Sequence, residues 1–185
     1  MSNKALIVID MQNDFIDGSL GTKEAQEIVP KVIEKIRNFD ENGNLYLTRD
    51  THGETYLDTQ EGKKLPIEHC ICGKDGWYVN KDILKAVEET NCNIKGYFDK
   101  PTFGSLKMMD YFRKWYVDTS DVEITLVGLC TDICVISNAM LLKAALPETR
   151  IIVDAACCAG VTPESHRNAL EAMKMCQIEV INEEE

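Results

Sequence analysis

The 185-residue sequence has no long hydrophobic run and no excess of positive charge. Its first apolar stretch, residues 5–9, ends at Asp10. That is far short of the ~20 residues that cross a bilayer, and also shorter than the apolar region of a secretion signal. The net charge is −11, from 20 Lys and Arg against 31 Asp and Glu, and such a surface repels nucleic acids and anionic lipids. We therefore expect a cytoplasmic protein that binds neither nucleic acid nor membranes.

Glycine motifs that bind phosphate are also missing. The segment from Gly18 to Gly21 has the spacing of neither a Walker A loop nor a dinucleotide-binding loop, so no nucleotide cofactor is indicated. Eight cysteines occur in a chain that is large enough to fold on its own core and has no export signal, which predicts free thiols rather than a disulfide framework. We interpret the adjacent Cys157 and Cys158 as inert thiols.

Composition and length indicate one globular domain, residues 1–185. Hydrophobic residues make up 44% of the chain and charged residues 28%, which is typical of a globular protein, and a single core can serve chains up to about 250 residues. Strand-length apolar runs alternate with segments of helical spacing. The expected strands are residues 5–9, 45–47, 96–98, 122–127, 151–153 and 178–181, and the expected helices are residues 30–40, 81–89, 105–116, 131–146 and 163–176.

This alternation predicts an α/β, doubly wound fold, in which six parallel strands form a sheet with helices on both faces. In such sheets the chemistry lies beyond the carboxyl ends of the strands. The connection from residue 49 to residue 79 is too long for a simple loop, so it is either a functional loop or contains an element that the pattern does not identify.

Asp10, Lys100 and Cys134 each follow an expected strand and should face the same edge of the sheet. A thiol needs a proton acceptor and a nearby cation to act as a nucleophile near neutral pH, and a carboxylate and an ammonium group supply both. Each residue also has an ordinary structural interpretation, as a turn cap, a solvated charge and a small core residue. Their joint position favours a reactive cysteine site.

Asp50 and His52 form a second candidate group with His69. Residues two apart in an extended segment point to the same side, and imidazole with carboxylate suits zinc, iron or manganese. An Asp–His hydrogen bond that orders a loop is the structural alternative, and a zinc site of His69, Cys70 and Cys72 is another. The remaining histidine, His166, is interpreted as a surface or packing residue of the last helix.

Five segments together resemble the isochorismatase-like cysteine hydrolases, and within them the nicotinamidases. They are ALIVIDMQNDF (residues 5–15), DTH (50–52), LPIEHC (65–70), DKP (99–101) and GLCTDICV (128–135). The resemblance runs nearly from end to end of the chain. It implies a six-stranded parallel sheet and a catalytic Asp10, Lys100 and Cys134 triad. The motif Asp-x-His with a later His distinguishes nicotinamidases from isochorismatases.

The resemblance also implies roles for further residues. Cys134 would attack a carboxamide to form a thioester, and the backbone amides of Cys130 and Cys134 would bind the oxyanion, next to a cis Leu129–Cys130 peptide bond. One divalent metal ion (zinc, iron or manganese) would orient the substrate, and Phe15 would stack on the substrate ring. The implied ligands of the metal ion are Asp50, His52 and His69, with Glu61 as a fourth candidate.

Two positions depart from the family pattern. Nicotinamidases often have an aromatic residue shortly before the second metal-binding histidine, whereas this chain has residues 65–68 without one, so Trp77 is the candidate for the opposite wall of the ring pocket. Cys130 stands where a smaller or aliphatic residue is common.

The leading hypothesis is therefore a nicotinamidase that converts nicotinamide to nicotinate and ammonia in NAD recycling, as a homo-oligomer by family likeness. The first alternative is a cysteine hydrolase of the same superfamily that acts on another small amide or ureido substrate. The second is a non-catalytic binding protein on the same fold, against which the filled triad positions argue.

Overall fold

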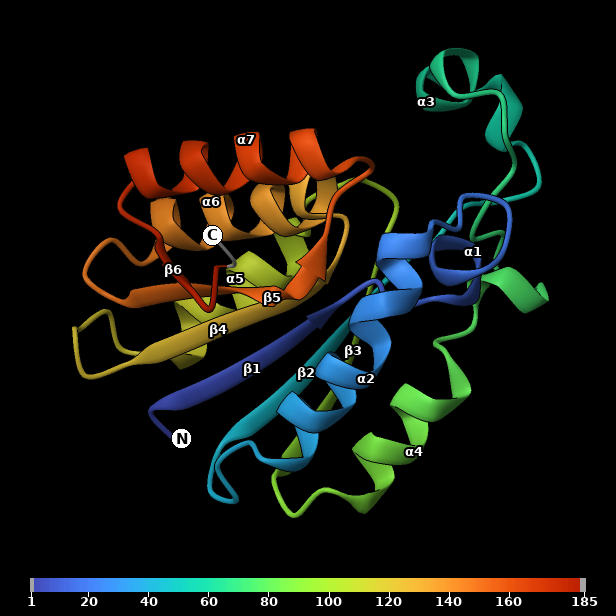
Figure 1. Ribbon diagram of the computed structural model, residues 1–185. Coiled ribbons are helices and arrows are strands. Elements are labelled where there is room, and N and C mark those ends of the chain that lie inside the picture. Colours follow the sequence, from blue (N-terminus) through green and yellow to red (C-terminus); the bar gives the residue numbers. More distant parts are fainter. Residues whose placement is uncertain (1, 184–185) are drawn as a thin grey trace.

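The computed structural model describes residues 2–183, so Met1 and the last two residues of the predicted domain lie outside the described part. Six parallel strands form one sheet in the order β3-β2-β1-β4-β5-β6 (Figure 1). The strands are β1 (Lys4–Ile9), β2 (Asn44–Asp50), β3 (Asn93–Lys100), β4 (Glu123–Leu129), β5 (Arg150–Ala159) and β6 (Glu179–Ile181). This confirms the predicted α/β fold. The strand order reverses between β1 and β4, and the crevice at that point is where such sheets bind ligands.

Helices cover both faces of the sheet (Figure 1). One face carries α2 (Lys23–Arg37) and α4 (Lys81–Glu89), and the other carries α5 (Leu106–Trp115), α6 (Ile136–Ala145) and α7 (Pro163–Met175). Successive residues of β1 point alternately into the two cores: Leu6 and Val8 into the first, Ile7 and Ile9 into the second. Burial on both sides explains why the central strands read as continuous apolar runs.

The prediction for the first long helix was wrong at its start. The spacing placed the start at Pro30, but α2 begins seven residues earlier because the Thr22 hydroxyl caps it by accepting a hydrogen bond from Ala25 N–H at 3.0 Å. Pro30 therefore lies inside the helix, where it removes one backbone donor. The buried face of α2 offsets this loss.

The long connection after β2 contains short elements that the sequence pattern did not reveal. They are 3₁₀ turns at Tyr56–Asp58 and Asp75–Trp77 and the helix α3 (Gln60–Lys64) between them. Thr59 caps α3 by accepting a hydrogen bond from Gly62 N–H at 3.0 Å. A short α1 (Asn13–Ile16) follows β1. In Figure 1, α3 stands apart from the layered body and above the carboxyl ends of the strands.

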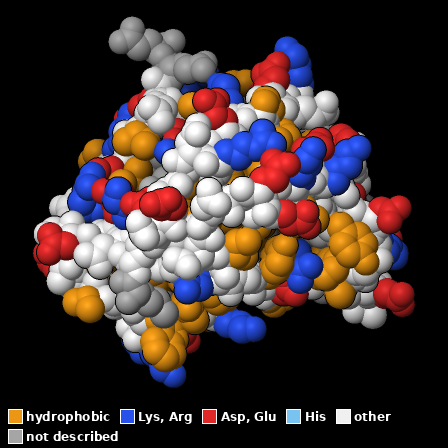
Figure 2. Space-filling view, turned by 90° about the horizontal axis from the view of Figure 1, so that it is seen from below, with side chains coloured by type: hydrophobic (Ala, Val, Ile, Leu, Met, Phe, Trp, Pro, Cys, Tyr) orange, Lys and Arg blue, Asp and Glu red, His pale blue; other side chains and the backbone are white. Residues whose placement is uncertain are grey.

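All eight cysteines are free, as predicted. Between residues 2 and 183, no helix is both long and apolar enough to span a bilayer. On the face shown in Figure 2, Lys and Arg side chains are scattered among acidic ones rather than gathered into one basic patch.

Candidate active site

Asp10, Lys100 and Cys134 meet at the carboxyl ends of β1, β3 and β4. Lys100 Nζ lies 2.6 Å from Asp10 Oδ2 and donates a 3.4 Å hydrogen bond to Cys134 Sγ. All three residues are buried, at 0%, 1% and 4% exposure in that order. A thiol, a proton acceptor and a cation are thus in mutual contact, which is what covalent catalysis by cysteine requires.

The electrostatics keep the thiol neutral at rest. Burial raises the pKa of Cys134 well above its usual 9.0, the Asp10 charge adds to the rise and the Lys100 charge opposes it. Burial likewise raises the pKa of Asp10 above 3.8, against the lowering effect of Lys100. Burial alone would lower the pKa of Lys100, but the neighbouring acidic groups, Asp10 foremost and Asp50 among them, together outweigh burial and raise the pKa, so the ammonium group stays charged. The site therefore combines a protonated thiol with a carboxylate that is more basic than an exposed one.

Local backbone geometry delivers Asp10 to this position. Asp10 adopts a left-handed conformation, with φ of 46°, directly after β1. The buried Thr48 of β2 holds it there: its hydroxyl donates to Asp10 Oδ1 at 2.6 Å and accepts from Asp10 N–H at 3.2 Å. This short bond to a buried carboxylate is the charge-assisted kind.

Cys134 lies on a turn of π-helix, Thr131–Val135, where the prediction had one continuous helix. The Leu129–Cys130 peptide before it is cis, as expected from the resemblance. Asn138 ties this turn to the loop after β3, since its Nδ2 donates to the carbonyls of Cys134 (2.8 Å) and Phe103 (3.1 Å). Sequence reasoning missed Asn138, because its partner loop lies 35 residues away and no motif marks it.

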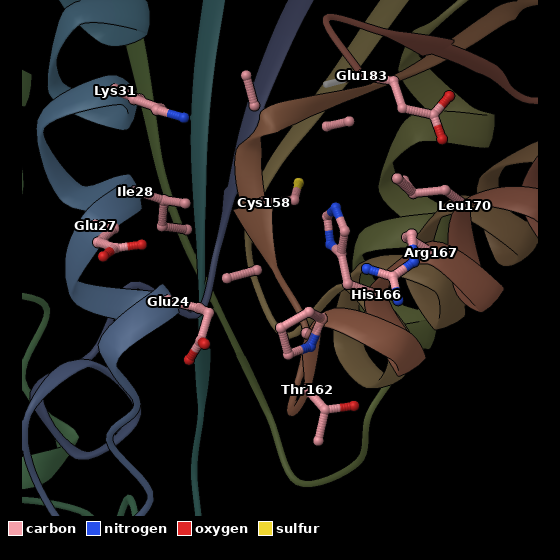
Figure 3. Close-up of a pocket in the computed structure, with 15 residues that line it drawn as sticks. Glu24, Glu27, Ile28, Lys31, Cys158, Thr162, His166, Arg167, Leu170 and Glu183 are labelled. Carbon is pink, nitrogen blue, oxygen red and sulfur yellow. The ribbon is translucent and has the colours of Figure 1, made fainter. Parts of the chain in front are cut away.

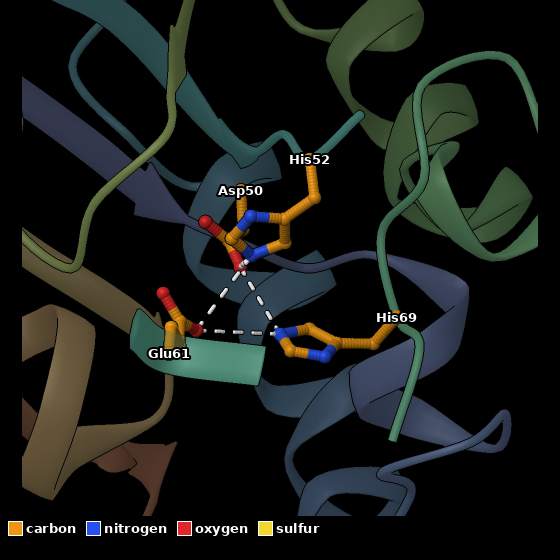
Figure 4. A group of neighbouring side chains, drawn as sticks. All are labelled: Asp50, His52, Glu61 and His69. Carbon is orange, nitrogen blue, oxygen red and sulfur yellow. Dashed lines mark hydrogen bonds and ion pairs between the residues drawn. The ribbon is translucent and has the colours of Figure 1, made fainter. Parts of the chain in front are cut away.

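Asp50, His52, Glu61 and His69 form a second cluster beside the first (Figure 4). Their ligand atoms all lie within 4.8 Å of one another. His52 Nε2 is 3.0 Å from Asp50 Oδ2, and the Nε2 atoms of His52 and His69 are each 3.7 Å from Glu61 Oε1. Asp50 Oδ1 accepts no hydrogen bond from any described residue, although Lys100 Nζ lies 3.6 Å away. Two imidazoles and two carboxylates in a buried, converging set fit zinc, iron or manganese.

Neighbouring residues hold Asp50 and His69 of this cluster in place. Gln12, fully buried, accepts from Asp50 N–H at 2.7 Å and donates to Asp50 O at 2.9 Å. His69 Nδ1 hydrogen-bonds to the Ile67 carbonyl at 2.9 Å, which leaves Nε2 directed at the cluster. Burial would raise the pKa of Asp50, but hydrogen bonds from His52 and His69 lower it well below its usual value.

Aromatic rings surround the two histidines. Phe15 lies 5.6 Å from His69 between ring centroids, and its role as a ring wall stays a prediction. Tyr56, which the sequence analysis did not single out, lies 4.7 Å from His52 and 4.9 Å from His69. Tyr56 is 1% exposed, and its hydroxyl donates to Leu65 O at 2.9 Å. In the sequence, only the position of Tyr56 four residues after His52 indicated that it could lie near the histidines.

A cavity of about 810 Å³ joins both groups, since Cys134 and all four residues of the second cluster line it. Phe15 lies on its wall, and Phe103 and Leu65 also line it. Trp77, the predicted opposite wall, does not: its Nε1–H donates to Thr51 Oγ1 at 2.9 Å, and Arg49 lies 3.9 Å over its ring. The prediction for Trp77 was wrong because the chain turns back after His69 and carries it outside the cavity.

The alternative zinc site of His69, Cys70 and Cys72 is also wrong. Only His69 of these three contributes to the convergent group found among residues 2–183. Cys70 N–H instead donates to Asp14 Oδ2 at 2.7 Å, and Cys72 is exposed. Backbone bonding explains this, because Cys70 and Cys72 flank the bridge that pairs Ile71 with His52.

Comparison with known proteins places this geometry in a family. The model of the isochorismatase domain matches residues 4–185. The chain belongs to the isochorismatase family. The nicotinamidase/pyrazinamidase of Mycobacterium tuberculosis is 25% identical over 188 residues, covering 96% of this chain and 98% of that protein. The protein is therefore a nicotinamidase-like hydrolase of the isochorismatase family.

Solved structures agree with the family assignment. The pyrazinamidase of Pyrococcus horikoshii in complex with zinc is 26% identical, with a TM-score of 0.75 over 97% of this chain and 99% of that one. The N-carbamoylsarcosine amidase of Thermoplasma acidophilum is 27% identical, with a TM-score of 0.71 over 98% of each chain. Solved structures with this fold thus include proteins named for different amide substrates.

Proposed function

We propose that this isochorismatase-family hydrolase is a metal-dependent nicotinamidase, which converts nicotinamide to nicotinate and ammonia through a thioester on Cys134. The observation that carries the proposal is the shared cavity, in which a metal-ligand set lies beside a buried thiol. Nicotinamide needs both features, because its ring nitrogen is a metal ligand and its carboxamide is the group to be cleaved. The likeness to nicotinamidases over nearly the whole chain supports this substrate.

In acylation, Asp10 takes the proton of the Cys134 thiol while the sulfur attacks the carboxamide carbon. The new S–C bond makes a tetrahedral oxyanion, which the backbone N–H groups of Cys130 and Cys134 stabilise. Asp10 then gives the proton to the amide nitrogen, the C–N bond breaks and ammonia leaves. Lys100, 2.6 Å from Asp10, balances the charge of the carboxylate before the first transfer and after the second.

In deacylation, a water molecule attacks the thioester carbon and Asp10 accepts one of its protons. The C–S bond breaks, nicotinic acid leaves and releases its remaining proton to solvent to become nicotinate, and the Cys134 sulfur recovers the other proton from Asp10. The raised pKa of Asp10 suits both transfers, because a base works best when its pKa approaches the working pH.

The second cluster and the aromatic walls bind and orient the substrate. Asp50, His52, Glu61 and His69 would hold the zinc, iron or manganese ion. When bound, such an ion offers a coordination position to the pyridine nitrogen and so contributes to substrate orientation. We assign the stacking face of the ring pocket to Phe15, with Phe103 and Leu65 in the place first given to Trp77.

A second candidate function is hydrolysis of another small amide or ureido compound by the same residues. The cavity of about 810 Å³ favours it, because such a volume lies near the upper end for pockets that hold drug-sized ligands and exceeds the needs of a single pyridine ring. The likeness to an N-carbamoylsarcosine amidase supports a ureido substrate by its chemistry and not by its size.

A substrate panel separates the two candidates. Ammonia release would be measured from nicotinamide, pyrazinamide and N-carbamoylsarcosine, with zinc-loaded protein, chelator-treated protein and the Cys134→Ala variant. The nicotinamidase proposal expects the highest kcat/KM for nicotinamide and loss of activity in both controls. Preference for the ureido compound would favour the second candidate, and no turnover at all would favour a binding protein.

The proposal includes the remaining expectations from the sequence. We propose that residues 1–185 act as one domain in a cytoplasmic homo-oligomer that recycles NAD precursors and has neither nucleic acid nor membranes as partners.

A further inference from the structure

A second cavity, of about 380 Å³, lies between α2 and α7 and shares no lining residue with the cavity that holds Cys134. Figure 3 shows Glu24, Glu27 and Lys31 of α2 along one side, with His166 and Arg167 of α7 along the other. His166 is half-buried. It is more than the packing residue that the sequence predicted, because it contacts the turn that carries the thiol.

Two contacts attach the start of α7 to that turn. His166 Nδ1 shares a 2.7 Å hydrogen bond with Oγ1 of Thr131, which is fully buried and opens the π-helical turn. Beside it, Val161 N–H donates to the carboxylate oxygens of Asp132 at 3.2 and 3.3 Å. The first two residues of the turn are therefore held from a segment about 30 residues further along the chain.

Two features of the sequence allow the start of α7 to lie this close to the turn that carries Cys134: a glycine before the helix and a capping residue at its start. An added Cβ at Gly160 would lie 2.9 Å from His166 N, closer than side-chain carbons approach backbone atoms. The Thr162 hydroxyl accepts from Ser165 N–H at 3.0 Å, which fixes the first turn of α7 and with it the position of His166.

We propose that His166 is a positioning residue that acts through Thr131 on the nucleophile. In the sequence, Thr131 lies between Cys130 and Cys134, whose amides bind the oxyanion in the proposed function, on which this inference rests. The bond to His166 holds the turn so that these amides and Cys134 Sγ keep their relative places. His166 does not line the cavity of Cys134, so it does not touch the substrate.

This arrangement separates catalysis from binding. The substrate ring is held by Phe15 and the second cluster, which come from other parts of the chain. Relaxation of the Thr131 turn therefore misplaces the reacting groups and leaves the ring subsite unchanged. Misplacement by about 1 Å costs on the order of 100-fold in rate. The loss should thus fall on kcat and not on KM.

The test compares His166→Phe, which keeps a ring but no hydrogen-bonding nitrogen, with His166→Asn, which places an amide near the former Nδ1. Thr131→Val removes the other partner, and Arg167→Ala, at the neighbouring exposed position in the same cavity, is the matched control. For each variant we would measure kcat and KM for nicotinamide, the melting temperature, and the pH midpoint of Cys134 alkylation by iodoacetamide.

We expect His166→Phe and Thr131→Val each to lower kcat by about 10- to 100-fold with KM little changed, and His166→Asn to recover most of the loss. The double variant should be no slower than the slower single one, because both changes break one contact. Additive losses, an effect shared by Arg167→Ala, or a fall in kcat that merely follows the melting temperature would overturn the proposal.

The alkylation assay keeps this test distinct from the test of function, because it needs no substrate. If wild-type protein does not hydrolyse nicotinamide, the proposed function fails, and His166 is judged on the thiol alone. If His166 positions the turn, the pH midpoint of Cys134 alkylation should shift more in His166→Phe than in Arg167→Ala. In His166→Asn it should return toward the wild-type value. Equal midpoints in all variants would refute it.

Discussion

Thr48→Val tests the electrostatic account of Asp10 most sharply, because it changes one hydroxyl and little shape. Thr48 is 1% exposed, donates to Asp10 Oδ1 at 2.6 Å and accepts from Asp10 N–H. A hydrogen bond to a charged group contributes about 1.5–3 kcal/mol. Because this hydrogen bond stabilises the ionised carboxylate, its loss should raise the pKa of Asp10 further.

The sign of the stability effect follows from linkage. Burial already raises the pKa of Asp10 above 3.8 in the folded protein, so the folded state binds the Asp10 proton more tightly than the unfolded state does. The stability that Asp10 contributes through this proton is therefore lost as the pH rises through the folded pKa. Thr48→Val raises that pKa further. The extra destabilisation, about 1.5–3 kcal/mol, is therefore complete only above the raised pKa of Asp10 and shrinks as the pH falls and Asp10 is protonated. For a chain of this size it corresponds to a fall of about 3–12 °C in melting temperature.

Two assays check this prediction. Thermal unfolding from pH 5 to pH 8 gives the stability difference, and the acid limb of kcat/KM gives the pKa of the proton acceptor in the free enzyme. That limb should move to higher pH in Thr48→Val, whereas Thr48→Ser, which keeps the hydroxyl, should resemble wild type. If the valine variant has the wild-type acid limb, the hydroxyl does not govern Asp10 and the reasoning fails.

Three further predictions address other parts of the site. Asp10→Asn should lower the rate of turnover by about 10²–10⁴-fold. The same variant should react faster with iodoacetamide at Cys134 at pH 8, because the Asp10 charge raises the pKa of that thiol. Slower alkylation would contradict this. Glu61→Gln should weaken zinc binding by at least about tenfold in a chelator competition, since Glu61 is one of four convergent ligands, and unchanged affinity would exclude it from the ligand set. Gly160→Ala should lower stability by about 1–3 kcal/mol in urea unfolding, because the new methyl meets the backbone of α7; a neutral effect would mean that α7 can shift.

The sheet and most of the site could be predicted because they depend on local patterns. Each central strand is an apolar run, and the parallel topology brings the residues after these runs to one edge. Asp10 and Lys100 follow directly from this rule. The start of α2 was missed because a single capping hydroxyl, that of Thr22, outweighed the usual preference of proline for a first turn.

The rest depends on the path of the connection between β2 and α4, which no periodicity describes. Tyr56 reaches the histidines because that connection folds back on itself, and the same path carries Trp77 away from the cavity. Asn138 and the His166–Thr131 bond join segments about 35 residues apart. Such contacts follow from tertiary packing, so a sequence pattern could not reveal them.

The most direct test of the central claim is the reaction of zinc-loaded protein with nicotinamide in the presence of hydroxylamine, which intercepts a thioester and yields the hydroxamate of nicotinate. Ammonia and hydroxamate would be measured together in wild type, in Cys134→Ala, and in Cys130→Ala as a control for loss of a neighbouring thiol. The account predicts both products in wild type and in Cys130→Ala, and neither in Cys134→Ala. Ammonia release that persists in Cys134→Ala, or its absence from wild type, would contradict it.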